Sequence, residues 1–496
     1  MPVASVSGWV LVAAATLSLA SCAAPADSDA GYTVVIPRGP ESLDPRFTTD
    51  PYGIKVTRLI HRSLFTVDPF RLEVVGDLAE SHRFESPTRL RIQLVRDAHF
   101  SDGSVLDASD VKATLDGLAN DAVDSVYAGT FRRIAEVEVL GPYELVITLA
   151  APHATILTDL EVPILRAEDA YRARLLAPES FVGAGPFRLR EWDGPTLRLE
   201  RVYGDGPASV RLIVLRDENG RALRLLSGKA DAALNAIPQV LLPMFEKDER
   251  FTVDTAAGIG TSYLGFRLDE GLFSDPRMRR AVAHAVDVDA IVNGTLGGRA
   301  QPASSWVPNG HWADLALPRP RFDPTHARAL IRDAGAAGRR VVLRTSSDRQ
   351  RVSICEAIAS MLRAVGLDVE VRPSESASLI ADLNAGRFEL TYLQVPEVFE
   401  PHVLHWFFAS ERVPDGVPGA NRWRLRDSQL DAALERGRAS QRHDERVRAY
   451  ATVQRRLAEA LPVLPLWQEA NVAVFRRGAE SRVPRDGRLR GLLQRP

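Results

Sequence analysis

Two segments of the chain alternate hydrophobic and polar residues with the two-residue period of a β-strand. In residues 88–96, Leu90, Ile92 and Leu94 share one face, and the positions between them are polar. Residues 143–149 (YELVITL) show a similar alternation. Because successive side chains of a strand point to opposite faces of a sheet, both segments are predicted to be strands buried on one side.

Three later segments carry apolar residues at helical spacing. Asp-Pro pairs begin the segments at residues 275–292 and 323–335, where the aspartate can cap a helix and the proline fits its first turn. A third helix is predicted over residues 351–366, where Cys355 lies beside the apolar stripe as a small core residue. Strands and helices alternate irregularly along the chain, which predicts a mixed α/β (α+β) fold.

The longest apolar run lies at residues 8–20 (GWVLVAAATLSLA). It is shorter than the roughly 20 residues that span a bilayer, and it fits the core of a signal peptide. The string LASC, which ends at Cys22, resembles the bacterial lipobox, in which the cysteine is lipidated and becomes the mature N-terminus. We therefore expect a signal peptide over residues 1–21, lipidation of Cys22 and a tether over residues 22–30. Residues 1–21 contain no Lys or Arg, so the usual basic leader is missing. An ordinary cleaved signal peptide with an incidental cysteine is the alternative.

Length and charge narrow the possible classes of protein. A chain of 496 residues is too long for one hydrophobic core and should form two or three domains. Lys and Arg together number 62 and Asp and Glu 64, so the chain has no large positive field that would attract nucleic acid. No nucleic-acid partner is expected.

Signatures of catalysis and of metal binding are missing from the sequence. It contains no G-x-S-x-G, H-E-x-x-H, G-x-x-x-x-G-K-[ST] or G-x-G-x-x-G pattern, and we therefore expect a protein that is not an enzyme. Its many carboxylates leave a glycosidase-like pair, and hence a secreted hydrolase, as an alternative. His402 and His405 form an H-x-x-H pair that could hold nickel, but no cysteine or third ligand lies near them in the sequence. No metal and no cofactor are expected.

A series of motifs along the chain resembles the motifs of a known family. The chain resembles the extracellular solute-binding proteins of the dipeptide, oligopeptide and nickel importers, called bacterial solute-binding family 5. The resemblance runs from about residue 32 to residue 478, and the matching stretches follow the family's order. They are PESLDPRFTTD (40–50), LIHRSLFTVD (59–68), GDLAESHRFE (76–85), RIQLVRDAHFSDGSVLDASDVKATLDG (91–117), FVGAGPFRLREW (181–192), TSYLGFRLDEGLFSDPRMRRAVAHAVDVDAIV (261–292) and the closing helices and Pro-rich crossover of residues 430–472.

The resemblance implies a periplasmic-binding-protein-like fold (type II, cluster C) with two lobes, a hinge and an extra inserted domain. The expected boundaries are 31–46, 183–263 and 465–496 for lobe I, 47–182 for the inserted domain and 264–464 for lobe II. The chain would cross between the lobes near residues 263–267 and 464–468.

The resemblance also implies a function. Such a protein captures a peptide-like ligand between its lobes and delivers it to the permease of an ABC importer. The protein would be a monomer, held by its lipid on the extracytoplasmic side of the cell membrane. An oligosaccharide, a nickel chelate or another small solute remains an alternative ligand, and a purely structural envelope lipoprotein is a third class.

The segment LQVPEVFEPH at residues 393–402 carries the main ligand-binding candidates. It resembles W-x-x-D-x-x-D/E-P, in which peptide-binding members use the first aspartate to neutralise the ligand's ammonium group. Glu397 stands at that position, and Glu400-Pro401 at the acidic-proline pair. Gln394 stands where an aromatic residue is common, and Pro396 removes a backbone donor. The alternative for Glu397 is a solvated loop carboxylate.

Further candidates lie at the lobe crossings and in the first loop. Tyr263 and Trp467 could each wall the cleft or pack the hinge. Arg267 stands where the family has asparagine and could bind a ligand carboxylate, with a surface salt bridge as the alternative. Glu41 belongs to a loop that lines the cleft in the family, and residues 421–423 are weaker candidates.

Overall fold

A computed structural model describes residues 31–172, 174–395 and 398–493. The predictions for the signal peptide, the tether and Cys22 lie outside the described residues, and so does Glu397. None of the described helices is long and apolar enough to cross a membrane.

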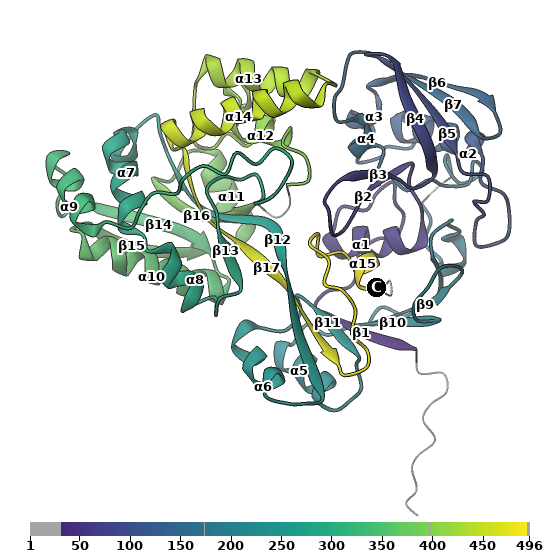
Figure 1. Ribbon diagram of the computed structural model, residues 1–496, viewed down its shortest axis with the longest axis horizontal. Coiled ribbons are helices and arrows are strands. Elements are labelled where there is room, and N and C mark those ends of the chain that lie inside the picture. Colours follow the sequence, from purple (N-terminus) through teal and green to yellow (C-terminus); the bar gives the residue numbers. More distant parts are fainter. Residues whose placement is uncertain (1–30, 173, 396–397, 494–496) are drawn as a thin grey trace, which may run out of the picture.

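The largest element is an eleven-stranded sheet that runs through the whole molecule (Figure 1). Ten of its strands follow one path, and β13 (Ala300–Pro302) pairs separately with β17. In spatial order the path is β15 (Asp368–Ser374), β14 (Arg340–Ser346), β16 (Leu390–Val395), β12 (Phe251–Phe266), β17 (Val463–Arg476), β11 (Ala232–Leu234), β1 (Tyr32–Ile36), β10 (Ser209–Val214), β9 (Thr196–Arg201) and β8 (Phe187–Trp192).

Strands β12 and β17 link the two halves of this sheet. They pair antiparallel, β12 running from residue 251 to residue 266, and their register shifts between Ala257 and Thr261 and again between Ser262 and Tyr263. At one end they adjoin β16 and the strands beyond it, and at the other they adjoin β11 and β1. Figure 1 shows the two strands crossing the centre of the molecule between these halves. We call them the crossing strands.

The half of the sheet that contains β14 to β16 is covered by helices. One core joins β14, β15 and β16 to the nearest helices, and a second core lies among the C-terminal helices around Trp423. The helices are α7 (Pro276–Ala285), α8 (Val288–Asn293), α9 (Pro324–Asp333), α10 (Arg349–Ala364), α11 (Ser376–Asn384), α12 (Val403–Phe408), α13 (Ser428–Ala439) and α14 (His443–Ala460), with 3-10 turns η3 (Leu272–Ser274) and η4 (Ser410–Arg412).

The other half contains β1, and its sheet is packed on both faces. One face packs against α5 (Glu218–Leu226), η2 (Gln239–Leu241) and α6 (Leu242–Glu246). The other face packs against α1 (Pro51–Ile60) and α15 (Leu489–Leu492). The chain therefore returns at its C-terminal end to the half in which the described part begins.

A second, four-stranded sheet stands apart with the order β4-β5-β7-β6. Residues 79–159, from β4 to α4, are called the four-stranded region below. Leu90, Ile92 and Leu94 are fully buried in its core, which confirms the strand predicted over residues 88–96. Its elements and neighbours are β2 (Phe65–Val67), β3 (Val74–Gly76), β4 (Ala79–Ser86), β5 (Arg89–Leu94), α2 (Ala108–Ala119), α3 (Ala128–Phe131), β6 (Ile134–Gly141), β7 (Glu144–Leu149), α4 (Ile156–Asp159) and the 3-10 turn η1 (Pro178–Ser180).

The predicted helices need one correction. The segment 275–292 is two helices, α7 and α8, because Val286 is extended and Asp287 begins a new helix by accepting a hydrogen bond from the backbone of Ala290. The helices predicted over 323–335 and 351–366 are confirmed as α9 and α10, and Cys355 is buried in the core. The mixed α/β fold class is likewise confirmed.

Candidate functional site

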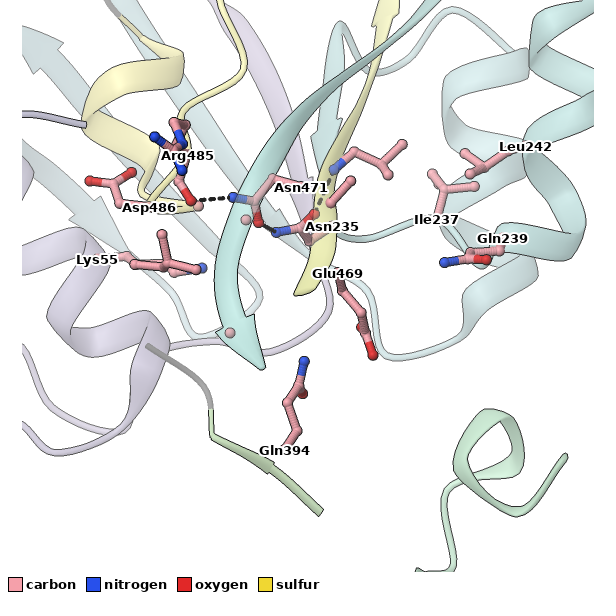
Figure 2. Close-up of a pocket in the computed structure, with 16 residues that line it drawn as sticks. Lys55, Asn235, Ile237, Gln239, Leu242, Gln394, Glu469, Asn471, Arg485 and Asp486 are labelled. Atoms are coloured by element: carbon pink, nitrogen blue, oxygen red, sulfur yellow. Dashed lines mark hydrogen bonds between the residues drawn. The ribbon is translucent and has the colours of Figure 1, made fainter. Parts of the chain in front are cut away.

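A cavity of about 310 Å³ lies beside the crossing strands (Figure 2). Segments from both halves of the large sheet and from α1 meet around it. Its lining residues are Lys55, Asn235, Ile237, Gln239, Leu242, Gly258, Ile259, Gly260, Gln394, Glu469, Ala470, Asn471, Val472, Arg485, Asp486 and Gly487.

The register shift in the crossing strands forms one wall of the cavity. Between Ala257 and Thr261 the ladder with β17 is interrupted, and Gly258 and Gly260 line the cavity there. A Cβ atom at position 258 would lie 2.1 Å from the carbonyl oxygen of Glu469, so only glycine lets the two backbones approach this closely. The irregularity interrupts the pairing of Glu469 with β12, although Glu469 still pairs with Ala300 of β13, and Glu469 lines the cavity at this point.

The Glu469 carboxylate is held by a chain of hydroxyl groups. Ser262 Oγ donates to Glu469 Oε1 at 3.2 Å, and Tyr392 Oη donates to Ser262 Oγ at 3.0 Å. Burial and the neighbouring Glu469 carboxylate raise the pKa of Tyr392, so its hydroxyl keeps its proton and stays a donor. These partners of Glu469 are neutral, and the carboxylate therefore brings a negative charge to the cavity wall.

Gln394 enters the cavity from the end of β16. Its side-chain oxygen accepts a hydrogen bond from Arg351 Nη2 at 3.3 Å, and Arg351 lies in the first turn of α10. In Figure 2 the Gln394 side chain points up toward the space between Lys55 and Glu469. Because its oxygen is engaged, the amide nitrogen is the group that Gln394 can offer to a ligand.

A C-terminal loop forms the facing wall, and two asparagines hold it in place. Asn471 Nδ2 donates to the carbonyl oxygens of Pro484 and Arg485 at 3.0 and 2.7 Å. Asn235 in turn donates to Asn471 Oδ1 at 2.7 Å (Figure 2). This clasp fixes Asp486 at the cavity, where its carboxylate also accepts a hydrogen bond from the backbone of Arg488 at 2.9 Å.

Arg485 spans the two halves of the molecule. Its Nε donates to the carbonyl oxygen of Ala257 at 3.2 Å, and its Nη2 donates to that of Asn309 at 3.1 Å. Ala257 lies in β12, whereas Asn309 lies in the loop that follows β13. Burial lowers the pKa of Arg485, but an arginine stays charged. The cavity thus has carboxylates from Glu469 and Asp486 and cations from Lys55 and Arg485.

Of the residues predicted from sequence, the structure places Gln394 at the cavity. Tyr263 and Trp467 lie on the crossing strands but are buried, Tyr263 against Trp306 and Trp423, and Trp467 against Tyr392. Neither is among the described residues that line the cavity. Their placement favours hinge packing, the second of the two roles that the sequence left open.

The remaining candidates have other partners. Arg267 forms ion pairs with Asp269 at 2.8 Å and Glu270 at 2.6 Å, which favours the salt-bridge alternative for this residue. Glu41 is exposed, and its backbone N–H donates to Asp50. Asn421 is buried, and its side chain donates to the carbonyl oxygens of Phe408, Ala409 and Leu425.

The His402 and His405 pair has no metal-site geometry in the part of the chain that the structure describes. No group of three or more His, Cys, Asp or Glu side chains is placed there to hold a metal ion. Burial lowers the pKa of His402 to about 4, and His405 lies 3.5 Å from Glu411.

Sequence reasoning missed most of the cavity's charged residues. Glu469 and Asn471 follow Trp467 by two and four residues, so the alternation of strand β17 could have pointed to them. Arg485 and Asp486 lie beyond residue 478, where the family resemblance ends, and Lys55 carried no local signal. Long-range hydrogen bonds, those of the Asn235–Asn471 clasp and the one from Arg485 to Ala257, bring the C-terminal loop to the crossing strands.

Comparisons with known proteins agree with this architecture. The fold, with two halves joined by a pair of crossing strands, is that of the type II periplasmic binding proteins. NikA from Brucella suis in complex with Fe(III)-EDTA superimposes with a TM-score of 0.79 at 24% identity, over 91% of this chain and 96% of that one. DppA from Helicobacter pylori in complex with the peptide STSA gives 0.75 at 20%, over 93% and 97%. CtaP from Listeria monocytogenes gives 0.82 at 17%, over 94% and 99%.

The sequence itself identifies the family. Residues 73–410 match the bacterial extracellular solute-binding proteins, family 5 (middle region), and the chain belongs to this family. The glutathione-binding protein GsiB of Escherichia coli K12 is 27% identical over 341 residues, which are 66% of this chain and 65% of GsiB. The matched segment therefore spans just under two thirds of that relative's length. The family consists of solute-binding proteins of ABC importers rather than enzymes.

Proposed function

We propose that the cavity beside the crossing strands binds a small, zwitterionic, peptide-like solute, which the protein delivers to the permease of an ABC importer. The observation that carries the proposal is that two carboxylates, Glu469 and Asp486, and two cations, Lys55 and Arg485, line one cavity. A carboxylate can receive a ligand's ammonium group, and a cation can receive its carboxylate.

The size of the cavity also supports a small solute. Its volume of about 310 Å³ lies at the lower end of the range of ligand sites, which is about 300–1,000 Å³. Relatives and neighbours carry ligands of this kind: GsiB is named for glutathione, and DppA of H. pylori holds the peptide STSA. Glu397 remains a candidate for a further carboxylate, since it follows Gln394 by three residues along the chain.

Ligand capture would use the two halves as lobes. We propose the division into lobe I (31–46, 183–263 and 465–496), an inserted domain (47–182) and lobe II (264–464), with the crossing strands as the hinge. A solute that contacts both lobes stabilises the closed state, and the importer can then distinguish loaded from empty protein by shape.

Mass spectrometry of the solute that co-purifies with the protein tests the proposed ligand class. After gentle denaturation, the released solute should carry both an amino and a carboxyl group. Calorimetry with that solute and with its N-acetylated and C-amidated forms should then show that each blocking group weakens binding by about 30-fold or more. A released oligosaccharide, or a nickel chelate without a free amine, would overturn the proposed ligand class.

We further propose that Cys22 is lipidated and anchors the protein to the extracytoplasmic face of the cell membrane. The support is the LASC string after an apolar run of signal-peptide length. Cys22→Ser should move the protein from the membrane fraction to the soluble fraction in a fractionation experiment. Membrane association that is unchanged in this variant would contradict lipid anchoring.

A further inference from the structure

The four-stranded region is fixed at its base to the half that contains β1. Just before the region, Asp77 pairs with Arg62 at 2.9 Å and with Arg490 at 3.3 Å. Just after it, Glu161 pairs with Arg58 at 2.9 Å and also with Arg488. Both carboxylates are nearly buried, so both chain ends of the region are tied to α1, the loop after it and the C-terminal segment by desolvated ion pairs.

The opposite edge of the region touches the other half of the molecule. The backbone N–H of Ala154, in the loop before α4, donates to the carbonyl oxygen of Arg438 at 3.1 Å. Gln441, between α13 and α14, donates through Nε2 to the carbonyl oxygen of Pro87 at 2.8 Å. We call these two hydrogen bonds the tip contact. In Figure 1 the ends of α13 and α14 reach the four-stranded sheet on the side of the molecule away from α5 and α6.

Ionisable groups also face one another behind the tip contact. His153 and Asp159 on the four-stranded region, joined at 2.6 Å, lie near His402 and Glu400, which belong to the segment that begins α12. Burial, together with the Asp159 carboxylate, raises the pKa of Glu400, while its partner Arg446 opposes this shift. The two surfaces are therefore close enough to interact electrostatically, although they belong to different halves.

We propose that the tip contact is a second clamp, which closes only when the two halves come together and which sets how long a captured solute is retained. The base of the region moves with the β1 half because its buried ion pairs hold it there. Any rotation about the crossing strands that separates the halves must break the bonds from Ala154 to Arg438 and from Gln441 to Pro87. The free energy of those bonds thus stabilises the closed state without contact to the solute.

A disulfide can report how often the clamp closes. Because the backbone nitrogen of Ala154 lies 3.1 Å from the carbonyl oxygen of Arg438, the two Cα atoms are at most about 7 Å apart, near the limit that a disulfide bridges. Ala154→Cys with Arg438→Cys, in a Cys22→Ser background, places one cysteine on each surface, and the buried Cys355 does not compete. The full-length protein is first stripped of co-purified solute. Mild oxidation should then link the cysteines, and the linked protein should have a smaller radius of gyration in small-angle scattering than the same protein reduced.

A point variant and its matched control sharpen the test. Gln441→Ala removes one hydrogen bond of the tip contact and should slow disulfide formation about fivefold. Gln429→Ala makes the same substitution at an exposed position of α13 and should leave the rate unchanged. The proposal is overturned if no disulfide forms, if the linked and reduced proteins have the same radius of gyration, or if the two glutamine variants form the disulfide equally fast. Both readouts use solute-free protein, so such a failure would leave the proposed ligand class untouched.

Discussion

Glu161 and Glu469 show two different uses of a carboxylate in the same protein. Glu161 lies at the base of the four-stranded region and is satisfied by two guanidinium groups, those of Arg58 and Arg488. Glu469 lies at the cavity and is held by the neutral hydroxyl of Ser262. A charge that is already paired inside the fold contributes to structure, whereas a charge held only by neutral donors can still pair with a ligand.

The largest effect is expected from Glu161→Gln. The change removes a nearly buried carboxylate that pairs with two guanidinium groups, which should lower the free energy of unfolding by about 3 to 5 kcal/mol. Chemical denaturation measures this loss. The matched control is Glu168→Gln, which removes a carboxylate from an exposed ion pair and should cost at most about 1 kcal/mol. Equal losses in the two variants would show that the ion pairs of Glu161 stabilise the protein no more than an exposed ion pair does.

Low pH should weaken the ion pairs of Glu161 that fix the four-stranded region. Burial by itself would raise the pKa of Glu161, but Arg58, Arg488 and hydrogen bonds lower it from the ordinary value of 4.5 to about 2. Because the folded-state pKa is the lower one, the contribution is complete above pH 4.5 and is lost as the pH falls from 4.5 toward 2. The shift corresponds to about 3 kcal/mol.

Denaturation at a series of pH values measures this loss in the wild type and in Glu161→Gln. The wild type should lose more stability than the variant between pH 4.5 and 2, since the variant has no carboxylate to protonate. Parallel pH profiles would rule out Glu161 as the source of the acid sensitivity.

A smaller effect is expected from Asn471, which positions the cavity wall but carries no charge. Asn471→Ala removes the donors to the carbonyl oxygens of Pro484 and Arg485 and should release the loop that carries Asp486. Affinity for the co-purified solute should fall about tenfold, measured by calorimetry, and stability by about 1 to 2 kcal/mol. Asn293→Ala, at the exposed end of α8, is the control. An affinity equal to that of the control would show that Asn471 is not needed to position the loop that carries Asp486.

Much of the fold could be predicted from the sequence, but one helix boundary could not. The fold followed from local patterns, such as the buried triplet of Leu90, Ile92 and Leu94, and from motifs spread over most of the chain. The split of residues 275–292 into two helices was missed because it depends on one extended residue, Val286, within a continuous apolar stripe. Local patterns do not reveal such a break.

The site was harder to predict because its residues meet only through long-range packing. Gln394 was found because it lies inside a recognised motif. Tyr263 and Trp467 occur at the predicted crossings, but large aromatic side chains at a strand crossing are drawn into the core. Asp486 is brought to the cavity by long-range contacts, the clasp made by Asn471 and the hydrogen bond from Arg485 to Ala257, which no pattern near Asp486 indicates.

Calorimetric titration of the wild type and of Glu469→Gln with the co-purified solute tests most directly whether the cavity is the binding site. The substitution keeps the shape of the side chain but removes the charge that would face the ligand's ammonium group. We expect a loss of affinity of about 30-fold or more, which corresponds to about 2 to 5 kcal/mol, with an unchanged free energy of unfolding. Glu249→Gln, at an exposed position outside the cavity, should bind like the wild type. A loss below about threefold, with a solute that carries an amine, would contradict the assignment of the cavity as the binding site.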